Sequence, residues 1–187
     1  MPPIELKDQF SSLRTEIIES EKARIDLLKY KLVAVATLGA VGLGVGNYAE
    51  GHGFIYAICI IPFVCNYVDL LCFHNSLRIL AIGRYLHNHG DPYEKFINTM
   101  RPPMAPISLF ELEDWVLQWS SVALSGIIAL FGIFFYHYSG LTDKSLGPIF
   151  IIVGLFGIIL PLIILRIYRN RVTMLFQGAK QLNANNT

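Results

Sequence analysis

Charged side chains are scarce in this sequence, and two long stretches have almost none. Lys, Arg, Asp and Glu together make up 16% of its 187 residues, whereas a soluble domain carries roughly 25%. Between Leu32 and Val68 the one charged residue is Glu50, and between Trp115 and Leu165 the charges are Asp143 and Lys144. This deficit excludes an ordinary water-soluble domain and predicts segments that lie in a lipid bilayer.

Signatures of several other protein classes are also missing. The net charge is +1, so no excess of positive charge points to direct nucleic-acid binding. The three cysteines, Cys59, Cys65 and Cys72, are odd in number and lie close together, which excludes a disulfide framework. No phosphate-binding glycine loop, serine nucleophile elbow or His-Glu-x-x-His sequence occurs. We therefore predict no enzyme activity, no catalytic residue and no cofactor.

Apolar runs of membrane-spanning length alternate with polar segments along the chain. This pattern predicts an all-α integral membrane protein with four transmembrane helices arranged as two hairpins, plus cytosolic helical extensions. The predicted segments are a cytosolic amphipathic helix (1–30), a first transmembrane hairpin (31–73), a cytosolic helical connector with a proline-rich turn (74–114), a second transmembrane hairpin (115–166) and a cytosolic helix end with a tail (167–187). The first span is expected at about 31–48.

The helix predicted for residues 1–30 carries an apolar face and a charged face. Leu6, Phe10, Leu13 and Ile17 recur at helical spacing and form the apolar face. The charged face is expected to be solvated and includes Arg24 among its members. Lys31, at the start of the first span, is expected to snorkel toward the membrane surface.

The distribution of basic residues predicts the orientation in the membrane. All Lys and Arg residues except Lys144 fall in the segments that four spans place on one side. Because basic residues concentrate in cytoplasmic segments, that side is the cytosol. We expect a multi-pass protein of the cell inner membrane with both termini in the cytosol.

Small residues at four-residue spacing predict close helix packing, and two prolines predict bent helices. Small residues let helices approach closely, either within one chain or between copies of it. The packing positions are Ala36, Ala40, Gly42, Gly44 and Gly46 in the first span and Ser121, Ser125 and Ala129 in the third. The bends are expected at Pro62 and Pro161.

Asp69 is the candidate functional charge, because it lies near the inner end of the second span. It either lines a pore vestibule or forms an ion pair between helices. Cys65, Asp69, Cys72 and Ser76 share one helix face, as metal ligands would, but that face holds no histidine. Packed cysteines and a paired Asp69 are therefore the favoured interpretation, and no metal is predicted.

Histidines near the end of residues 74–89 raise two further alternatives. His87, His89 and Asp91 are compact enough to hold a metal, but Asp91 is already explained as a helix cap. Arg84 and His89 have a spacing that resembles the ribonuclease motif of HEPN domains, yet that fold needs more soluble helical chain than this protein has. Neither alternative is favoured.

The layout of residues 16–89 resembles that of SLATT-type membrane effectors of bacterial defence systems. Glu16 to Lys31, the apolar hairpin from Leu32 to Phe73 and the amphipathic run from His74 to His89 match a cytosolic helix, a transmembrane hairpin and a second cytosolic helix. The resemblance implies oligomerisation and membrane permeabilisation on a signal from a partner. The second hairpin, 115–166, departs from the two-span pattern.

Two functions follow as expectations. The first is an oligomeric inner-membrane channel or membrane-permeabilising effector controlled through its cytosolic helices, with the bilayer and copies of itself as partners. The alternative is a non-conducting membrane anchor that recruits a soluble cytosolic protein through 1–30 and 74–114. A membrane enzyme that uses His74, His87, His89 or Asp91 is the least favoured.

Overall fold

A computed structural model describes residues 4–44, 52–89, 91, 109–138 and 146–184. These residues form four α-helices and one 3₁₀ helix, with no strand among them. The elements are α1 (Ile4–Gly42), η1 (His52–Ile60), α2 (Ile61–Asn88), α4 (Leu109–Tyr138) and α5 (Leu146–Ala184). The expectation of an all-helical protein is confirmed for this part of the chain.

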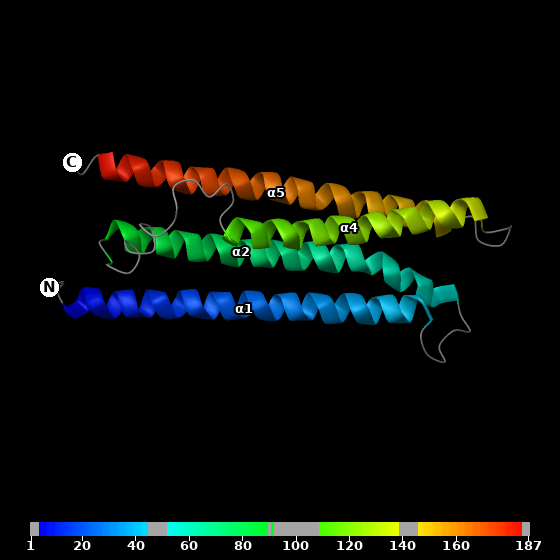
Figure 1. The fold of residues 1–187 in the computed structure, drawn as a ribbon, viewed down its shortest axis with the longest axis horizontal. Coiled ribbons are helices and arrows are strands. Elements are labelled where there is room, and N and C mark those ends of the chain that lie inside the picture. Colours follow the sequence, from blue (N-terminus) through cyan, green and yellow to red (C-terminus); the bar gives the residue numbers. More distant parts are fainter. Residues whose placement is uncertain (1–3, 45–51, 90, 92–108, 139–145, 185–187) are drawn as a thin grey trace.

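The helices lie side by side along one long axis (Figure 1). Helix α1 packs mainly against α2, and α4 packs mainly against α5. Helix α2 also contacts both α4 and α5, so it occupies the centre of the bundle. Helix α1 begins and α5 ends at the same end of the molecule, here called the termini end. The opposite end, where α1 and α4 finish, is called the loop end.

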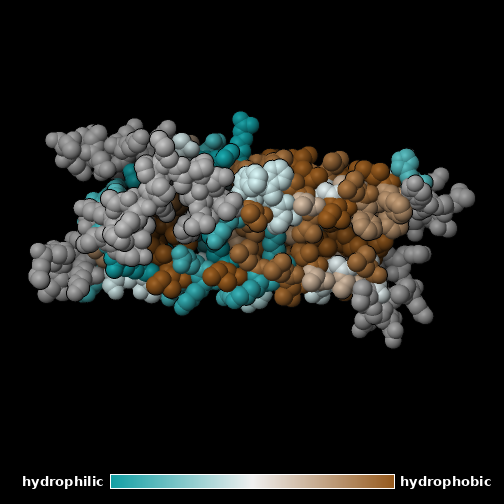
Figure 2. All heavy atoms as spheres, in the orientation of Figure 1, coloured by the Kyte–Doolittle hydropathy of each residue, from teal (hydrophilic) through white to brown (hydrophobic). Residues whose placement is uncertain are grey.

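Three helical segments are long and apolar enough to cross a membrane. They are Ile55–Asn88, Glu113–His137 and Leu146–Met174. Many large apolar side chains of these segments are exposed on the surface of the protein, among them Leu130, Phe131, Phe156 and Leu162. Figure 2 shows this apolar surface gathered toward the loop end and the hydrophilic surface gathered toward the termini end. A lipid bilayer around the apolar half would remove this surface from water, and that transfer is favourable for apolar side chains.

Helix α1 is one uninterrupted helix across the boundary predicted between residues 1–30 and the first span. It ends at Gly42, which is earlier than the predicted limit of 48. Gly44 follows with a φ of 71°, a left-handed conformation that glycine adopts at helix ends without strain. Gly44 therefore lies in a turn rather than on a helix face, and Gly46 lies outside the described residues.

The two prolines predicted to bend helices occupy different positions. Pro62 lies in the first turn of α2, where the chain changes from the 3₁₀ helix η1 to an α-helix. A proline fits there because the first turn has no intrahelical partner for its missing N–H. Pro161 lies inside α5, which continues from Leu146 to Ala184 on both sides of it. The proline-rich turn predicted near 101–106 lies outside the described residues.

Glycines bring α4 and α5 close together. A Cβ atom on Gly154 would meet the backbone N of Ala129 at 2.7 Å, and one on Gly157 would meet Ser125 Oγ at 2.5 Å. Ser125 and Ala129, expected to pack helices, thus face glycines on the neighbouring helix. This is the close approach that small residues permit between membrane helices.

Candidate functional site

The face of α1 that packs against the rest of the bundle carries polar as well as apolar side chains. Ser20, Arg24 and Lys31 are buried on it, with relative exposures of 5%, 6% and 5%. They continue a seam that half-buried Phe10, Leu13 and Ile17 begin at spacings of three and four residues. Arg24 was expected on the solvated face, and Lys31 was expected to reach the membrane surface. The structure corrects both expectations, because each side chain has a carboxylate partner inside the bundle.

The innermost of these contacts joins α1, α2 and α4. Lys31 Nζ lies 2.8 Å from Asp69 Oδ1, and both side chains are almost fully buried. Lys31 Nζ also donates to Ser121 Oγ at 2.7 Å, and Ser121 Oγ donates to Asp69 Oδ2 at 2.6 Å. The three side chains form a closed triangle in which every charge is opposed and hydrogen-bonded. A buried ion pair is tolerated only under those conditions.

The second contact draws on four helices. Arg24 on α1 donates to Asp114 Oδ1 on α4 at 2.8 Å. Asp114 also accepts a hydrogen bond from Tyr168 on α5 at 3.0 Å and one from Ser76 on α2 at 3.4 Å. Glu113 lies 3.3 Å from the same guanidinium but is exposed. Asp114 is therefore the one carboxylate of the described residues on which side chains from all three other α-helices converge.

The third contact lies nearest the termini end. The Arg14 guanidinium donates to both carboxylate oxygens of Asp91, at 2.6 and 2.9 Å. Asp91 is fully buried, and Arg14 is half exposed. The sequence predicted Asp91 as the cap of a following helix, and that helix lies outside the described residues. In the structure, Asp91 is the ion-pair partner of Arg14 on α1.

These three pairs, Lys31–Asp69, Arg24–Asp114 and Arg14–Asp91, form an ion-pair ladder along α1. In each rung α1 supplies the base and another segment supplies the acid. Seven residues separate Arg24 from Lys31, which is about 10 Å along a helix. Ion pairs inside the interface between helices fix the register of those helices, because sliding or rotating one helix separates the paired charges. The ladder therefore holds α1 in one position against the bundle.

Further buried polar residues extend this arrangement toward the loop end. Ser125 donates to the carbonyl of Ser121 at 2.8 Å, and Asn66 donates to the carbonyl of Pro62 at 2.7 Å. Gln118 donates to the carbonyl of Pro161. An apolar cluster then closes the bundle interior; it comprises Ile61, Cys65, Ile128, Leu146 and Phe150. From the termini end to Ser125 the interior thus mixes buried polar groups with apolar ones such as the cluster of Val68, Cys72 and Leu117, and beyond Ser125 the cluster is apolar.

The residues predicted for the first span behave differently from those of the third. Ala36 is exposed, Ala40 is half-buried and Gly42 lies against Ile58 of η1. Gly39 has no atom near its missing Cβ among the described residues. Leu32, Val33 and Leu43 on the same helix are 71%, 62% and 66% exposed. Much of the apolar part of α1 is therefore uncovered in a single chain.

The candidate metal clusters have other partners in the structure. No three His, Cys, Asp or Glu side chains come together as metal ligands would within the described ranges. The His89 ring stacks on Tyr85 with centroids 4.0 Å apart, and Asp91 is bound to Arg14. Cys65 and Cys72 are free and buried, packed within the two apolar clusters of the bundle.

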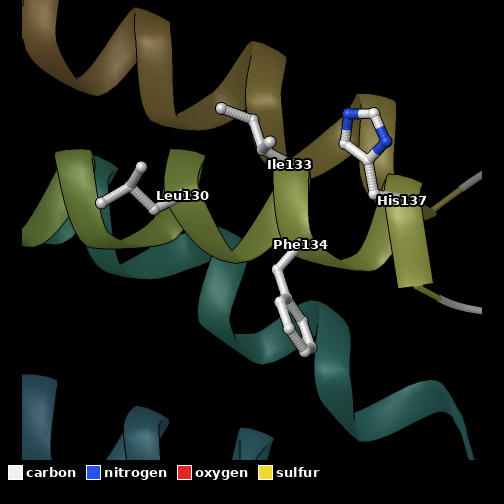
Figure 3. Close-up of a pocket in the computed structure, with 4 residues that line it drawn as sticks. All are labelled: Leu130, Ile133, Phe134 and His137. Carbon is white, nitrogen blue, oxygen red and sulfur yellow. The ribbon is translucent and has the colours of Figure 1, made fainter.

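The described residues line at least two surface hollows. One, of about 500 Å³, lies beside α4 near the loop end and is lined by Leu130, Ile133, Phe134 and His137. Figure 3 shows that all four side chains leave the same helix and that Phe134 points away from His137, so they do not converge on a ligand. The other, of about 420 Å³, lies between α2 and α5.

Of the residues that build the ladder, the sequence singled out Asp69, Ser121 and Asp91. It missed Arg14, Arg24, Lys31 and Asp114 as ion-pair partners. The available signal was the spacing of Arg24 and Lys31 by seven residues on the face that also carries Ile17. No protein-family model, curated protein or solved structure matches the chain.

Proposed function

We propose that this chain is an oligomeric channel or membrane-permeabilising effector of the cell inner membrane, controlled through its cytosolic helices. The termini end lies in the cytosol, and four helices cross the bilayer as two hairpins, α1 with α2 and α4 with α5. The basic side chains of α1 and α5 support this orientation, because Arg14, Arg24, Arg169 and Arg171 all lie toward the termini end.

One observation carries the proposal: the Lys31–Asp69–Ser121 triangle is buried, and two of its members, Asp69 on α2 and Ser121 on α4, belong to helical segments that are apolar enough to span a membrane. Ionisable side chains inside a membrane domain are costly, pair with one another, and mark ion pathways and proton relays. The polar groups from Asp114 to Ser125 supply the inner half of such a pathway. The apolar cluster around Phe150 closes the outer half, in the manner of a hydrophobic gate.

The ladder supplies the control. Helix α1 is held by the three ladder pairs, two of which are buried, and by the more exposed pair of Glu16 with Arg78 on α2. Arg24 and Lys31 connect α1 to α4 through hydrogen bonds to Asp114 and Ser121. A partner that pulls on the cytosolic part of α1 separates these pairs together. Asp69 is then left as an uncompensated charge that draws water into the bundle.

Oligomerisation is supported by the uncovered part of α1. Leu32 and Val33 are exposed, Ala36 is a small exposed residue one turn further on, and the space over Gly39 is open. This face meets either lipid or a second copy of the chain, and its small side chains favour close helix contact.

The test is ion flux from liposomes that contain purified full-length protein. We expect little flux from the wild type and greater flux from Asp69→Asn, which breaks the central ion pair. Lys29→Gln, which alters an exposed pair with Asp26 on the same helix, is the matched control and should behave as the wild type. Absence of flux from every variant, together with a monomer mass in detergent, would rule out the proposal.

The alternative is a non-conducting anchor that recruits a soluble protein. It is favoured by two apolar side chains on the cytosolic part of α1, Ile18 and Ile25, which are 52% and 53% exposed and lie seven residues apart on one face. Capture of a soluble protein by the wild type and not by an Ile18→Glu/Ile25→Glu variant, with no flux from either, would establish it in place of the channel.

A further inference from the structure

The hollow between α2 and α5 has a graded lining. Aromatic contacts show that the two helices run in the same direction here, because Phe63 pairs with Phe156 and Phe73 pairs with Tyr168 further along both helices. Leu70 and Ile164 therefore line the end of the hollow nearer the loop end of the molecule. This end is called the deep end, because it lies deeper in the proposed membrane. His74, Leu77 and Arg171 line the opposite end, nearer the termini end of the molecule, here called the shallow end. Arg171 lies seven residues beyond Ile164, about 10 Å along the helix axis.

The deep end of the hollow is apolar, and it is open along the outer surface of the protein. Leu70 and Ile167 are 50% and 55% exposed, and Leu71 and Ile164 are half-buried. Its floor is the stacked pair Phe73 and Tyr168, whose ring centroids are 4.7 Å apart. A volume of about 420 Å³ with such walls accommodates a flexible hydrocarbon chain.

The shallow end carries two basic side chains. Arg171 and His74 are both exposed, and neither makes an ion pair with another described residue. A guanidinium presents several N–H donors in a fixed plane, which suits the oxygens of a phosphate. The charge at this end is therefore complementary to an anionic headgroup, while the deep end is complementary to an acyl chain.

We propose that this groove binds an anionic glycerophospholipid of the cytosolic leaflet, with an acyl chain between Leu70 and Ile164 and the phosphate at Arg171 and His74. The inference rests on the membrane orientation proposed above, which places the apolar end of the groove in the hydrocarbon and the basic end among the headgroups. A cytosolic leaflet rich in anionic lipid supplies such a ligand at high local concentration.

The groove also touches the ion-pair ladder. Tyr168, in its floor, donates through its hydroxyl to Asp114, the carboxylate that holds Arg24 of α1. A lipid seated against the Phe73–Tyr168 stack restrains the Tyr168 side chain and with it the hydrogen bond to Asp114. Lipid binding is thereby linked to the contact that fixes α1, and it stabilises the conformation seen in this structure.

The experiment compares lipids with the same acyl chains and different headgroups. Purified full-length protein in a mild detergent is titrated with dioleoyl phosphatidylglycerol or dioleoyl phosphatidylcholine, and bound lipid is counted by native mass spectrometry alongside the unfolding temperature. We expect phosphatidylglycerol to be retained and to raise the unfolding temperature, and phosphatidylcholine to do neither to the same degree.

Three variants locate the site. Arg171→Gln should weaken phosphatidylglycerol binding roughly fivefold, as expected for one basic residue near an anionic headgroup. Arg166→Gln removes another exposed arginine of α5 that does not line the groove and should leave binding unchanged. Leu70→Trp fills the apolar end without changing charge and should also reduce binding.

The proposal is overturned if both lipids bind equally, if Arg166→Gln weakens binding as much as Arg171→Gln, or if inorganic phosphate alone reproduces the stabilisation. None of these measurements depends on ion flux. Lipid selectivity can therefore fail while conduction holds, and conduction can fail while lipid selectivity holds.

Discussion

Lys31 Nζ on α1 and Asp69 Oδ1 on α2 lie 2.8 Å apart, with 6% and 2% of their side-chain surfaces exposed. Among the described residues, each is the other's sole ion-pair partner. Ser121 is hydrogen-bonded to both of them, and Lys31 Nζ also lies within hydrogen-bond distance of Ser120 Oγ and the carbonyl of Leu117. The two residues are 38 positions apart in sequence, so the pair can form only when α1 and α2 have come together in one register.

Removing one member of this pair should destabilise the protein far more than removing both. Asp69→Leu leaves Lys31 as a lone buried charge, and we expect a loss of about 3–5 kcal/mol in unfolding free energy. The double variant Lys31→Met/Asp69→Leu replaces the pair by apolar side chains of similar size and should recover most of that loss. Unfolding in mild detergent, followed by circular dichroism, measures all three proteins.

The exposed pair Lys29–Asp26 is the matched control for this double-mutant cycle. Its atoms are 2.9 Å apart, but its side chains are 68% and 56% exposed. Such pairs contribute about 0–1 kcal/mol, so Asp26→Leu should cost little. If Asp69→Leu costs no more than Asp26→Leu, then Lys31 and Asp69 are not paired in the folded protein.

The hydroxyl of Tyr168 should stabilise the second rung of the ladder. Tyr168→Phe keeps the stack on Phe73 but removes the 3.0 Å hydrogen bond to Asp114. We expect a loss of about 1–3 kcal/mol, because a buried charged acceptor loses one of its donors. Tyr67→Phe, at a position 63% exposed, should be neutral in the same unfolding assay, and equal effects of the two changes would contradict the role given to Tyr168.

Much of the helix layout was predictable because apolar length is a property of local sequence. The helical segments 55–88, 113–137 and 146–174 each contain an apolar stretch long enough to cross a membrane. The partners of α1 were not predictable in the same way. Arg24 and Lys31 find Asp114 and Asp69 at separations of 90 and 38 residues, and local pattern holds no information on such contacts.

Two specific expectations failed for physical reasons. Lys31 was expected to snorkel because lysines near the end of a span usually reach the membrane surface, but a carboxylate and a serine inside the bundle offer it better partners. Arg24 was assigned to the solvated face because it is charged. In fact it occupies the same seam as Ile17 and Lys31, and helical spacing predicted its position better than its charge did.

Glycine-to-alanine changes should have opposite signs at different positions. At Gly154 an added Cβ would lie 2.7 Å from the backbone of Ala129, which cannot move without separating α4 from α5. We expect Gly154→Ala to lower the unfolding free energy by about 1–3 kcal/mol. At Gly39 nothing lies within 4 Å in a single chain, so Gly39→Ala should raise the unfolding free energy of the monomer by roughly 0.5–1 kcal/mol through the better helix propensity of alanine.

The same unfolding assay compares these two variants with the wild type. A destabilising Gly39→Ala would indicate that a second chain covers α1 in the detergent-solubilised protein, which the molecular mass would reveal. A neutral or stabilising Gly154→Ala would mean that α4 and α5 are further apart than in this structure.

Single cysteines should report the proposed topology directly. In a background with Cys59, Cys65 and Cys72 changed to alanine, Glu21→Cys on α1, His137→Cys on α4 and Arg169→Cys on α5 each place one exposed thiol outside the apolar band. A membrane-impermeant maleimide applied to intact spheroplasts should label position 137 alone, whereas inverted vesicles should expose positions 21 and 169. In the proposed topology α2 crosses the membrane and ends on the cytosolic side near Asp91. Labelling of position 21 from the cytosolic side then requires α1 to cross as well. Labelling of positions 137 and 169 from the same side would exclude the second hairpin, and with it the placement of Arg171 among cytosolic headgroups.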